Sequence, residues 1–145
     1  MEIEMQLKQS KLFIATLALI SMPLIANASL DLYNYTNEDS TVRVTSGSIK
    51  PCSSDLGVYT PKASPNGEPG NKFVKDSEIS GLCITSKDKT CTADIYNSNN
   101  CTGQVVGQAS LSLNSKSVTS IVVTDSRYSF EVEGNGTVLK VRYAK

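Results

Sequence analysis

Two cysteines enclose a short polar run, CTADIYNSNNCTG, and cysteines are the first residues here that could do chemistry. Cys91 and Cys101 flank an Asp, a Tyr and several Asn, while Cys52 and Cys83 come earlier in the chain. Thiolates bind metal when they stand in close pairs, often together with imidazole. The sequence has no C-x-x-C pair and no histidine, which argues against a metal site. An even number of cysteines is typical of disulfide bonds in an exported protein.

Of the three possible pairings, the sequence favours Cys52 with Cys83 and Cys91 with Cys101. The first bond would close a long loop, and the second would hold a strand to the turn that follows it. In the chain-entropy description, each bond contributes about 3 to 4 kcal/mol to stability. Disulfide bonds are therefore a sufficient reason for all four cysteines.

The absence of histidine also removes the usual general base and the Ser-His and Cys-His nucleophile pairs. Glu131 and Glu133, two residues apart on a predicted strand, would lie about 6 to 7 Å apart, close to the carboxylate separation of inverting glycosidases. Ser115 and Lys116 are adjacent and would face opposite sides of a strand. A solvated strand face accounts better for the two glutamates. We therefore expect no catalytic residues, no cofactor and no enzyme.

The segment that would carry this face, YSFEVEGNGTVLKVRY, has the pattern of a β-hairpin. Asn135-Gly136 is the preferred pair for a two-residue type I′ turn. The resulting register pairs Tyr128 with Tyr143, Phe130 with Val141 and Val132 with Leu139, which places these side chains on one apolar face. On the other face, Glu131 would lie opposite Lys140.

Other segments also alternate with a period of two, which is the period of a strand. Residues 104–113 alternate clearly, and residues 117–125 are rich in β-branched side chains, as in a central strand. Residues 30–36 and 40–46 are compatible with an opening hairpin across Asn37-Glu38-Asp39, and residues 81–86 and 91–97 flank a polar turn. No segment shows a sustained helical period. The sequence predicts an all-β, disulfide-stabilised antiparallel sandwich or Greek key of about seven short strands.

Residues 50–78 are the exception, because this stretch is rich in Pro and Gly and has little strand pattern. A long loop in a compact domain is either functional or an irregular crossover. If the protein has a binding surface, residues 58–73 are where we expect it. The candidate binding residues are Val58, Tyr59, Lys62, Asn66, Glu68 and Phe73.

The N-terminal residues 1–28 have the pattern of a cleaved secretory signal, which leaves residues 29–145 as a single domain. Lys8 and Lys11 precede an apolar run that Pro23 interrupts, and the run ends in Ala26-Asn27-Ala28. The sequence thus predicts export to the periplasm or the extracellular space. With 14 basic and 14 acidic residues, the chain gives no electrostatic case for binding nucleic acid, and we expect no membrane insertion after cleavage.

Binding signals are weak. Tyr33 and Tyr35 would share one strand face and Tyr59 lies in the long loop, an arrangement that allows an aromatic platform for sugars, although packing explains the strand pair better. The acidic turn at residues 37–40 has too few oxygens for calcium. The sequence therefore leaves open whether the partner is a protein or a glycan.

Two segments resemble one half of a βγ-crystallin-type Greek key. DIYNSNNCTG has Tyr96 and Gly103 at the aromatic-to-glycine spacing of that motif, and Thr119-Ser120 in SKSVTSIVV match its paired hydroxyl residues. Cys101 replaces the usual second aromatic, and Ser115-Lys116 stand where calcium-binding residues would be. More broadly, the chain is similar to small exported bacterial proteins of no assigned activity. The crystallin resemblance implies a related fold and makes peptidase inhibition one option.

These observations predict an exported, non-catalytic binding or interaction module on a disulfide-stabilised β-scaffold. The first alternative is a peptidase inhibitor that uses residues 58–73 as its loop. The second is a carboxylate-based hydrolase that uses Glu131 and Glu133.

Overall fold

The computed structural model describes residues 30–145, so the predicted signal segment 1–28 lies outside the described residues. The elements are β1 (Leu30–Asn34), β2 (Thr41–Val44), the 3₁₀ helix η2 (Ser53–Leu56), β3 (Gly70–Val74), α2 (Asp76–Leu82), β4 (Thr90–Tyr96), β5 (Val105–Ser112), β6 (Ser117–Val123), β7 (Tyr128–Glu133), the 3₁₀ turn η3 (Gly134–Gly136) and β8 (Val138–Tyr143). No helix among these residues is long and apolar enough to cross a membrane.

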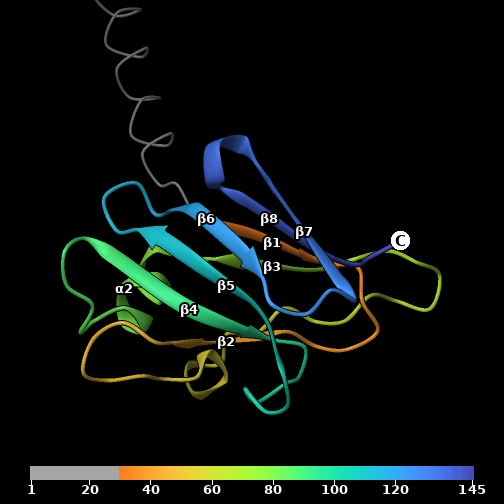
Figure 1. The fold of residues 1–145 in the computed structure, drawn as a ribbon, viewed down its shortest axis with the longest axis horizontal. Coiled ribbons are helices and arrows are strands. Elements are labelled where there is room, and N and C mark those ends of the chain that lie inside the picture. The colour runs from red at the N-terminus through yellow and green to blue at the C-terminus, as the bar shows by residue number, and fades with distance from the viewer. Residues whose placement is uncertain (1–29) are drawn as a thin grey trace, which may run out of the picture.

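The strands form two four-stranded sheets, with the orders β3-β1-β8-β7 and β2-β4-β5-β6 (Figure 1). Strands β1 and β8 are parallel, and the other neighbours are antiparallel. The predicted all-β sandwich is confirmed, with eight strands instead of about seven.

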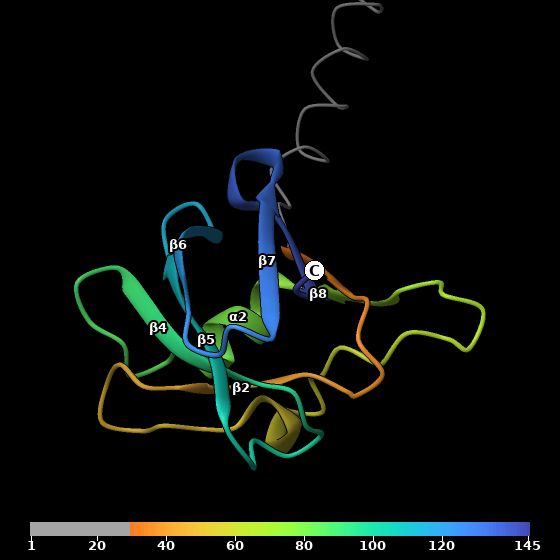
Figure 2. The same ribbon diagram turned by 45° about the vertical axis from the view of Figure 1, so that its right-hand side comes forward.

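The C-terminal hairpin has the predicted register, with Tyr128 opposite Tyr143 and Val132 opposite Leu139. Asn135 and Gly136 have φ values of 57° and 88°, which are the left-handed conformations that a type I′ turn requires. The turn projects beyond the rest of the fold in both views, so part of its apolar face is uncovered (Figures 1 and 2). Val132, near the turn, is 40% exposed, and Tyr143, at the opposite end of the hairpin, is 44% exposed. The local sequence pattern therefore predicted how β7 pairs with β8, but it did not predict how far the apolar side chains of the hairpin are buried.

Two strand predictions are wrong because they concern long-range pairing. Residues 30–36 and 40–46 do not form a hairpin, since β1 and β2 belong to different sheets. Residues 117–123 form the edge strand β6, not a central strand, and Val122 and Val123 are exposed. β-branched side chains favour a strand, but they do not determine its position in the sheet.

The predicted loop 50–78 contains regular structure that the sequence analysis missed: η2, β3 and the start of α2. Residues 81–86, expected beside a turn between strands, instead contain the end of α2. The helix starts where Glu78 accepts a hydrogen bond from the Lys75 N–H at 3.0 Å. It buries Ile79 and Leu82, which are three residues apart. A helix of seven residues is too short for a sustained period.

The disulfide pairing is also corrected, because Cys52 bonds to Cys101 and Cys83 bonds to Cys91. Cys91 is the second residue of β4, whereas Cys101 follows the strand, so most of an extended strand of roughly 3.3 Å per residue separates the two. That separation exceeds the Cα distance that a disulfide can span. The turn after α2 instead brings Cys83 to Cys91, with their Cα atoms 5.9 Å apart.

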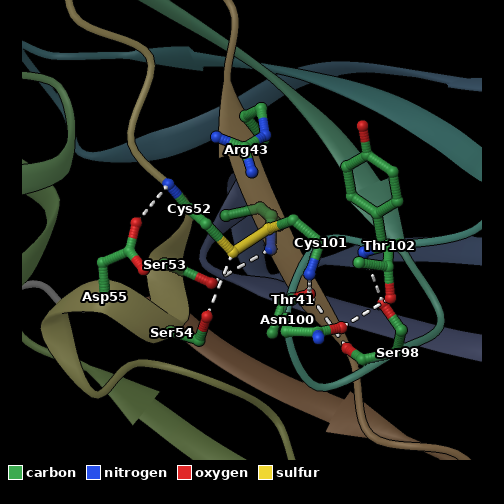
Figure 3. The surroundings of a disulfide bond; sticks show 12 residues. Thr41, Arg43, Cys52, Ser53, Ser54, Asp55, Ser98, Asn100, Cys101 and Thr102 are labelled. Atoms are coloured by element: carbon green, nitrogen blue, oxygen red, sulfur yellow. Dashed lines mark hydrogen bonds between the residues drawn. A yellow bond between two sulfur atoms is a disulfide. The ribbon is translucent and has the colours of Figure 1, made fainter.

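The bond between Cys52 and Cys101 lies in a polar setting (Figure 3). The Thr41 hydroxyl accepts a hydrogen bond from the Cys101 N–H at 3.0 Å and donates to the Ser98 carbonyl at 2.9 Å. The Cys52 N–H donates to Asp55 at 3.3 Å. This bond therefore fixes the β4–β5 loop to the segment that leads into η2.

Candidate functional site

The structure divides the predicted binding segment 58–73 into three parts. Val58 lies in the hydrophobic core and is 4% exposed. Thr60 pairs with Ser40 beside β2, which leaves Tyr59 46% exposed. Residues 61–69 form a projecting loop, and Phe73 lies on β3, where it is 57% exposed. Of the six predicted residues, the loop brings together Lys62, Asn66 and Glu68, all exposed.

Loop 61–69 extends to one side of the sandwich, where it is yellow-green in both views (Figures 1 and 2). Its base is held by main-chain donors: the Ala63 N–H donates to the Thr36 carbonyl at 2.8 Å, and the Lys62 N–H donates to Asp39 Oδ1 at 2.9 Å. At the tip, the Gly67 N–H donates to the Ser64 carbonyl at 2.9 Å. The loop therefore has a defined backbone although its side chains face solvent.

The two arms of the loop approach closely at its base. A Cβ atom on Gly70 would overlap the carbonyl of Pro61, so only glycine fits there. The Ser64 N–H also donates to the Glu68 carbonyl at 2.8 Å, which pairs the arms near the tip. Close packing and paired arms together restrain the exposed tip formed by Pro65 and Asn66.

The outer face of the sheet β3-β1-β8-β7 carries the predicted tyrosine pair, but other side chains already engage it. The Arg142 guanidinium lies 3.7 Å from the centre of the Tyr35 ring. The Tyr33 hydroxyl donates to Asp31 at 2.8 Å, and this hydrogen bond raises the pKa of the Tyr33 phenol. The ring face of Tyr35, which a sugar would need for stacking, is therefore occupied by a cation.

The glutamates considered for catalysis lie on this outer face in ion pairs. Glu131 accepts from Arg142 Nε at 3.2 Å, and Glu133 lies 3.1 Å from Lys140 Nζ. The hydrogen bond that Lys140 Nζ donates to Glu133 raises the pKa of Lys140. Glu131 lies opposite Lys140 in the register, as predicted, but the ion pairs form diagonally across β7 and β8. Each carboxylate is thus held by its own cation.

The sequence analysis missed an apolar cavity of about 120 Å³ between the two sheets. Residues from both inner faces line it, including Leu32, Ala93, Ala109, Leu111 and Leu139. Ala93 and Ala109 are direct partners on β4 and β5, so two methyl groups meet at the centre of one sheet. Small residues at inward positions of adjacent strands were the available signal, but the strand pairing was needed to recognise it.

Comparison with known proteins supports the architecture. No family model matches the sequence, and no curated protein matches it. A solved structure of similar fold is that of the Legionella pneumophila type II secretion system substrate NttC. The two chains are 20% identical with a TM-score of 0.59, over 81% of this chain and 98% of that chain. At this identity the likeness shows the fold alone, and these comparisons add no support to the βγ-crystallin resemblance.

Proposed function

We propose that this protein is an exported, non-catalytic binding module that presents loop 61–69 to a partner protein. The observation that carries the proposal is the exposed tip at Pro65 and Asn66 on a base whose backbone is fixed by hydrogen bonds. A loop held in one conformation loses little entropy on binding, which favours affinity. A protein partner suits this loop better than a glycan suits the outer face, because Arg142 covers Tyr35.

Two observations support export. Both disulfide bonds suit an oxidising compartment outside the cytoplasm. The similar structure is described as a substrate of a type II secretion system, which makes secretion a consistent fate for this chain as well. Non-catalytic binding is supported by the ion pairs of Glu131 and Glu133, since neither carboxylate is free to act alone.

Peptidase inhibition is the specific form of binding that the loop geometry favours. An inhibitor must offer a peptidase an exposed segment with a restrained backbone, and the Ser64–Glu68 and Ala63–Thr36 hydrogen bonds provide that restraint. The candidate residues for contact with the enzyme are those at the tip, with Lys62 and Glu68 beside it.

The test is a binding measurement with purified peptidases of the serine, cysteine, aspartic and metallo classes, alongside a glycan array. We expect one peptidase to bind the wild type, and Asn66→Ala or Pro65→Gly to weaken its binding about tenfold or more, as at other interface centres. Asn114→Ala is the matched control, because Asn114 is an exposed asparagine in the β5–β6 turn.

Three outcomes would reject the proposal. They are the absence of binding across the peptidase panel, binding that both tip variants leave unchanged, and binding confined to the glycan array. Turnover of a peptide or glycan that disappears when Glu131 and Glu133 are replaced by Gln would establish a hydrolase instead.

A further inference from the structure

The cavity between the sheets has a specific origin in the residues of its central rows. Ala93 pairs with Ala109, and their outer neighbours in the sheet are Val44 and Ile121. In the next row the small residue is Gly107, but there the Phe130 ring of the opposite sheet fills the space, 2.8 Å from where a Cβ would stand. The alanine row, by contrast, lies along the hollow of about 120 Å³.

The cavity is suited to an apolar guest and not to water. Apolar side chains dominate its lining, and the hydroxyls at its edge have partners elsewhere: Thr41 bonds to the Ser98 carbonyl, and Ser53 accepts the Val42 N–H at 3.0 Å. Among residues 30–145, no buried side-chain nitrogen or oxygen atom lacks a hydrogen-bond partner. Water in a buried site needs two or more polar partners, and a lining dominated by apolar side chains favours an apolar guest instead.

Several lining side chains keep surface that protein does not cover. Leu32 and Leu139 of one sheet and Ala93, Ala109 and Leu111 of the other are only partly buried, although all of them face the interior. An apolar group placed between the sheets would fill the cavity and cover these aliphatic side chains, and burial of both apolar surfaces is favourable.

We propose that this cavity is a binding site for a hydrocarbon group of about six carbons, because an apolar cavity of about 150 Å³, only slightly larger, is known to bind benzene. The group is either a small free molecule or the end of a longer acyl chain. The site is separate from loop 61–69, so this inference goes beyond the proposed function and its test is independent.

The experiment measures the thermal midpoint and the methyl NMR spectrum of the disulfide-bonded protein with benzene and with octanoate. We expect the ligand that fits to raise the midpoint by about 2 °C or more at saturation, by mass action on the folded state. The same ligand should shift the methyl signals of Ala93, Ala109 and Leu111, which line the cavity. A response to benzene alone indicates a small free molecule, and a response to octanoate indicates an acyl chain.

The matched variants are Ala109→Val, which fills the cavity, and Ala144→Val, which adds the same atoms at an exposed position. We expect the first to weaken binding about tenfold or more and the second to leave it unchanged. Ala93→Val repeats the test if Ala109→Val does not fold. The proposal is overturned if neither ligand shifts the wild-type midpoint, or if a folded filling variant binds as well as the wild type.

Discussion

The two sheets are held together differently at one end and at the centre of the sandwich. At the end, Asn34, Thr36, Asn97 and Tyr128 form a hydrogen-bonded group that we call the polar cluster. The Thr36 hydroxyl contacts Asn34 Oδ1 at 2.7 Å and Asn97 Oδ1 at 2.9 Å, and Asn97 donates to the Tyr128 hydroxyl at 3.0 Å. Because Asn34 and Tyr128 belong to one sheet and Asn97 follows β4 of the other, the cluster joins the sheets.

At the centre, by contrast, the sheets leave a cavity of about 120 Å³. At roughly 24 cal/mol per Å³, a closed cavity of this size would cost about 3 kcal/mol, which is an upper value here because several lining side chains are only partly buried. Hydrogen bonds contribute about 0.5 to 1.5 kcal/mol each, so the few bonds of the polar cluster offset a cost of this order. The contrast is therefore between directional bonds, which join the sheets at the end, and incomplete apolar packing at the centre.

The largest expected effect comes from the two disulfides, one in each region. The Cys52–Cys101 disulfide lies near Thr41 and Ser98, whereas Cys83 and Cys91 line the cavity. The bonds span 49 and 8 residues, so loss of the first should cost about 4 kcal/mol and loss of the second about 2.5 kcal/mol by the chain-entropy relation. Urea unfolding of the two double Cys→Ser variants measures both. If the two variants lost equal stability, or if loss of Cys83–Cys91 cost more, the comparison between the two regions would be contradicted.

The next effect tests the polar cluster itself. Asn34→Ala should lower the free energy of unfolding by about 3 kcal/mol, because buried partners lose their bonds. The Thr36 N–H, which donates to Asn34 Oδ1 at 2.9 Å, and the Glu38 carbonyl, which accepts from Asn34 Nδ2 at 2.7 Å, would both be left without this partner. Urea unfolding gives the value, with the exposed Asn114→Ala as control. A loss below about 1 kcal/mol would show that the cluster is not what joins the sheets.

The same contrast explains what the sequence could predict. The β7–β8 register was predicted because Asn135-Gly136 and the alternation around it are local signals. The polar cluster could not be predicted, because Asn34 and Asn97 are far apart in the sequence and nothing local links them. Asn34 and Thr36 even match a glycosylation sequon, yet both side chains are 0% exposed.

The two candidate sites also differ in whether local sequence signals could predict them. The loop was found from its Pro and Gly content, and its tip residue Asn66 lies where a binding surface was expected. The cavity depends on Ala93 facing Ala109 across two strands, and the disulfides depend on the path of α2. Both are products of long-range pairing, which the pattern of a single segment does not encode.

A third prediction tests the cavity through stability. Ala109→Val should raise the free energy of unfolding by about 1 kcal/mol, because added methyl groups enter unfilled apolar space and valine favours strands. Ala144→Val, at an exposed position, should change it by less than about 0.5 kcal/mol. A clear loss of stability in Ala109→Val would mean that the alanine row is already closely packed, and the contrast between the two regions would fail.

The smallest expected effect concerns acid and the turn that precedes Tyr128. Asp125 is 6% exposed, and its hydrogen bonds from the Arg127 guanidinium and N–H hold its pKa below the usual value. Its contribution to stability is therefore present above the unfolded pKa near 4 and is lost as pH falls through the lower folded value. Arg127→Gln removes the cause of this shift. We expect it to unfold slightly more easily at pH 7 and to lose less stability than the wild type between pH 4 and pH 2.

The matched control for that measurement is Lys62→Gln, which removes the same charge from the exposed loop. Glu78, whose pKa is also lowered by its hydrogen bond from the Lys75 N–H, contributes equally to the acid loss of both variants and so cancels in their comparison. If acid acts through Asp125, only Arg127→Gln flattens the pH dependence. If both variants flatten it alike, net charge is responsible, and the end of the sandwich that holds the polar cluster is no more sensitive to acid than its apolar centre.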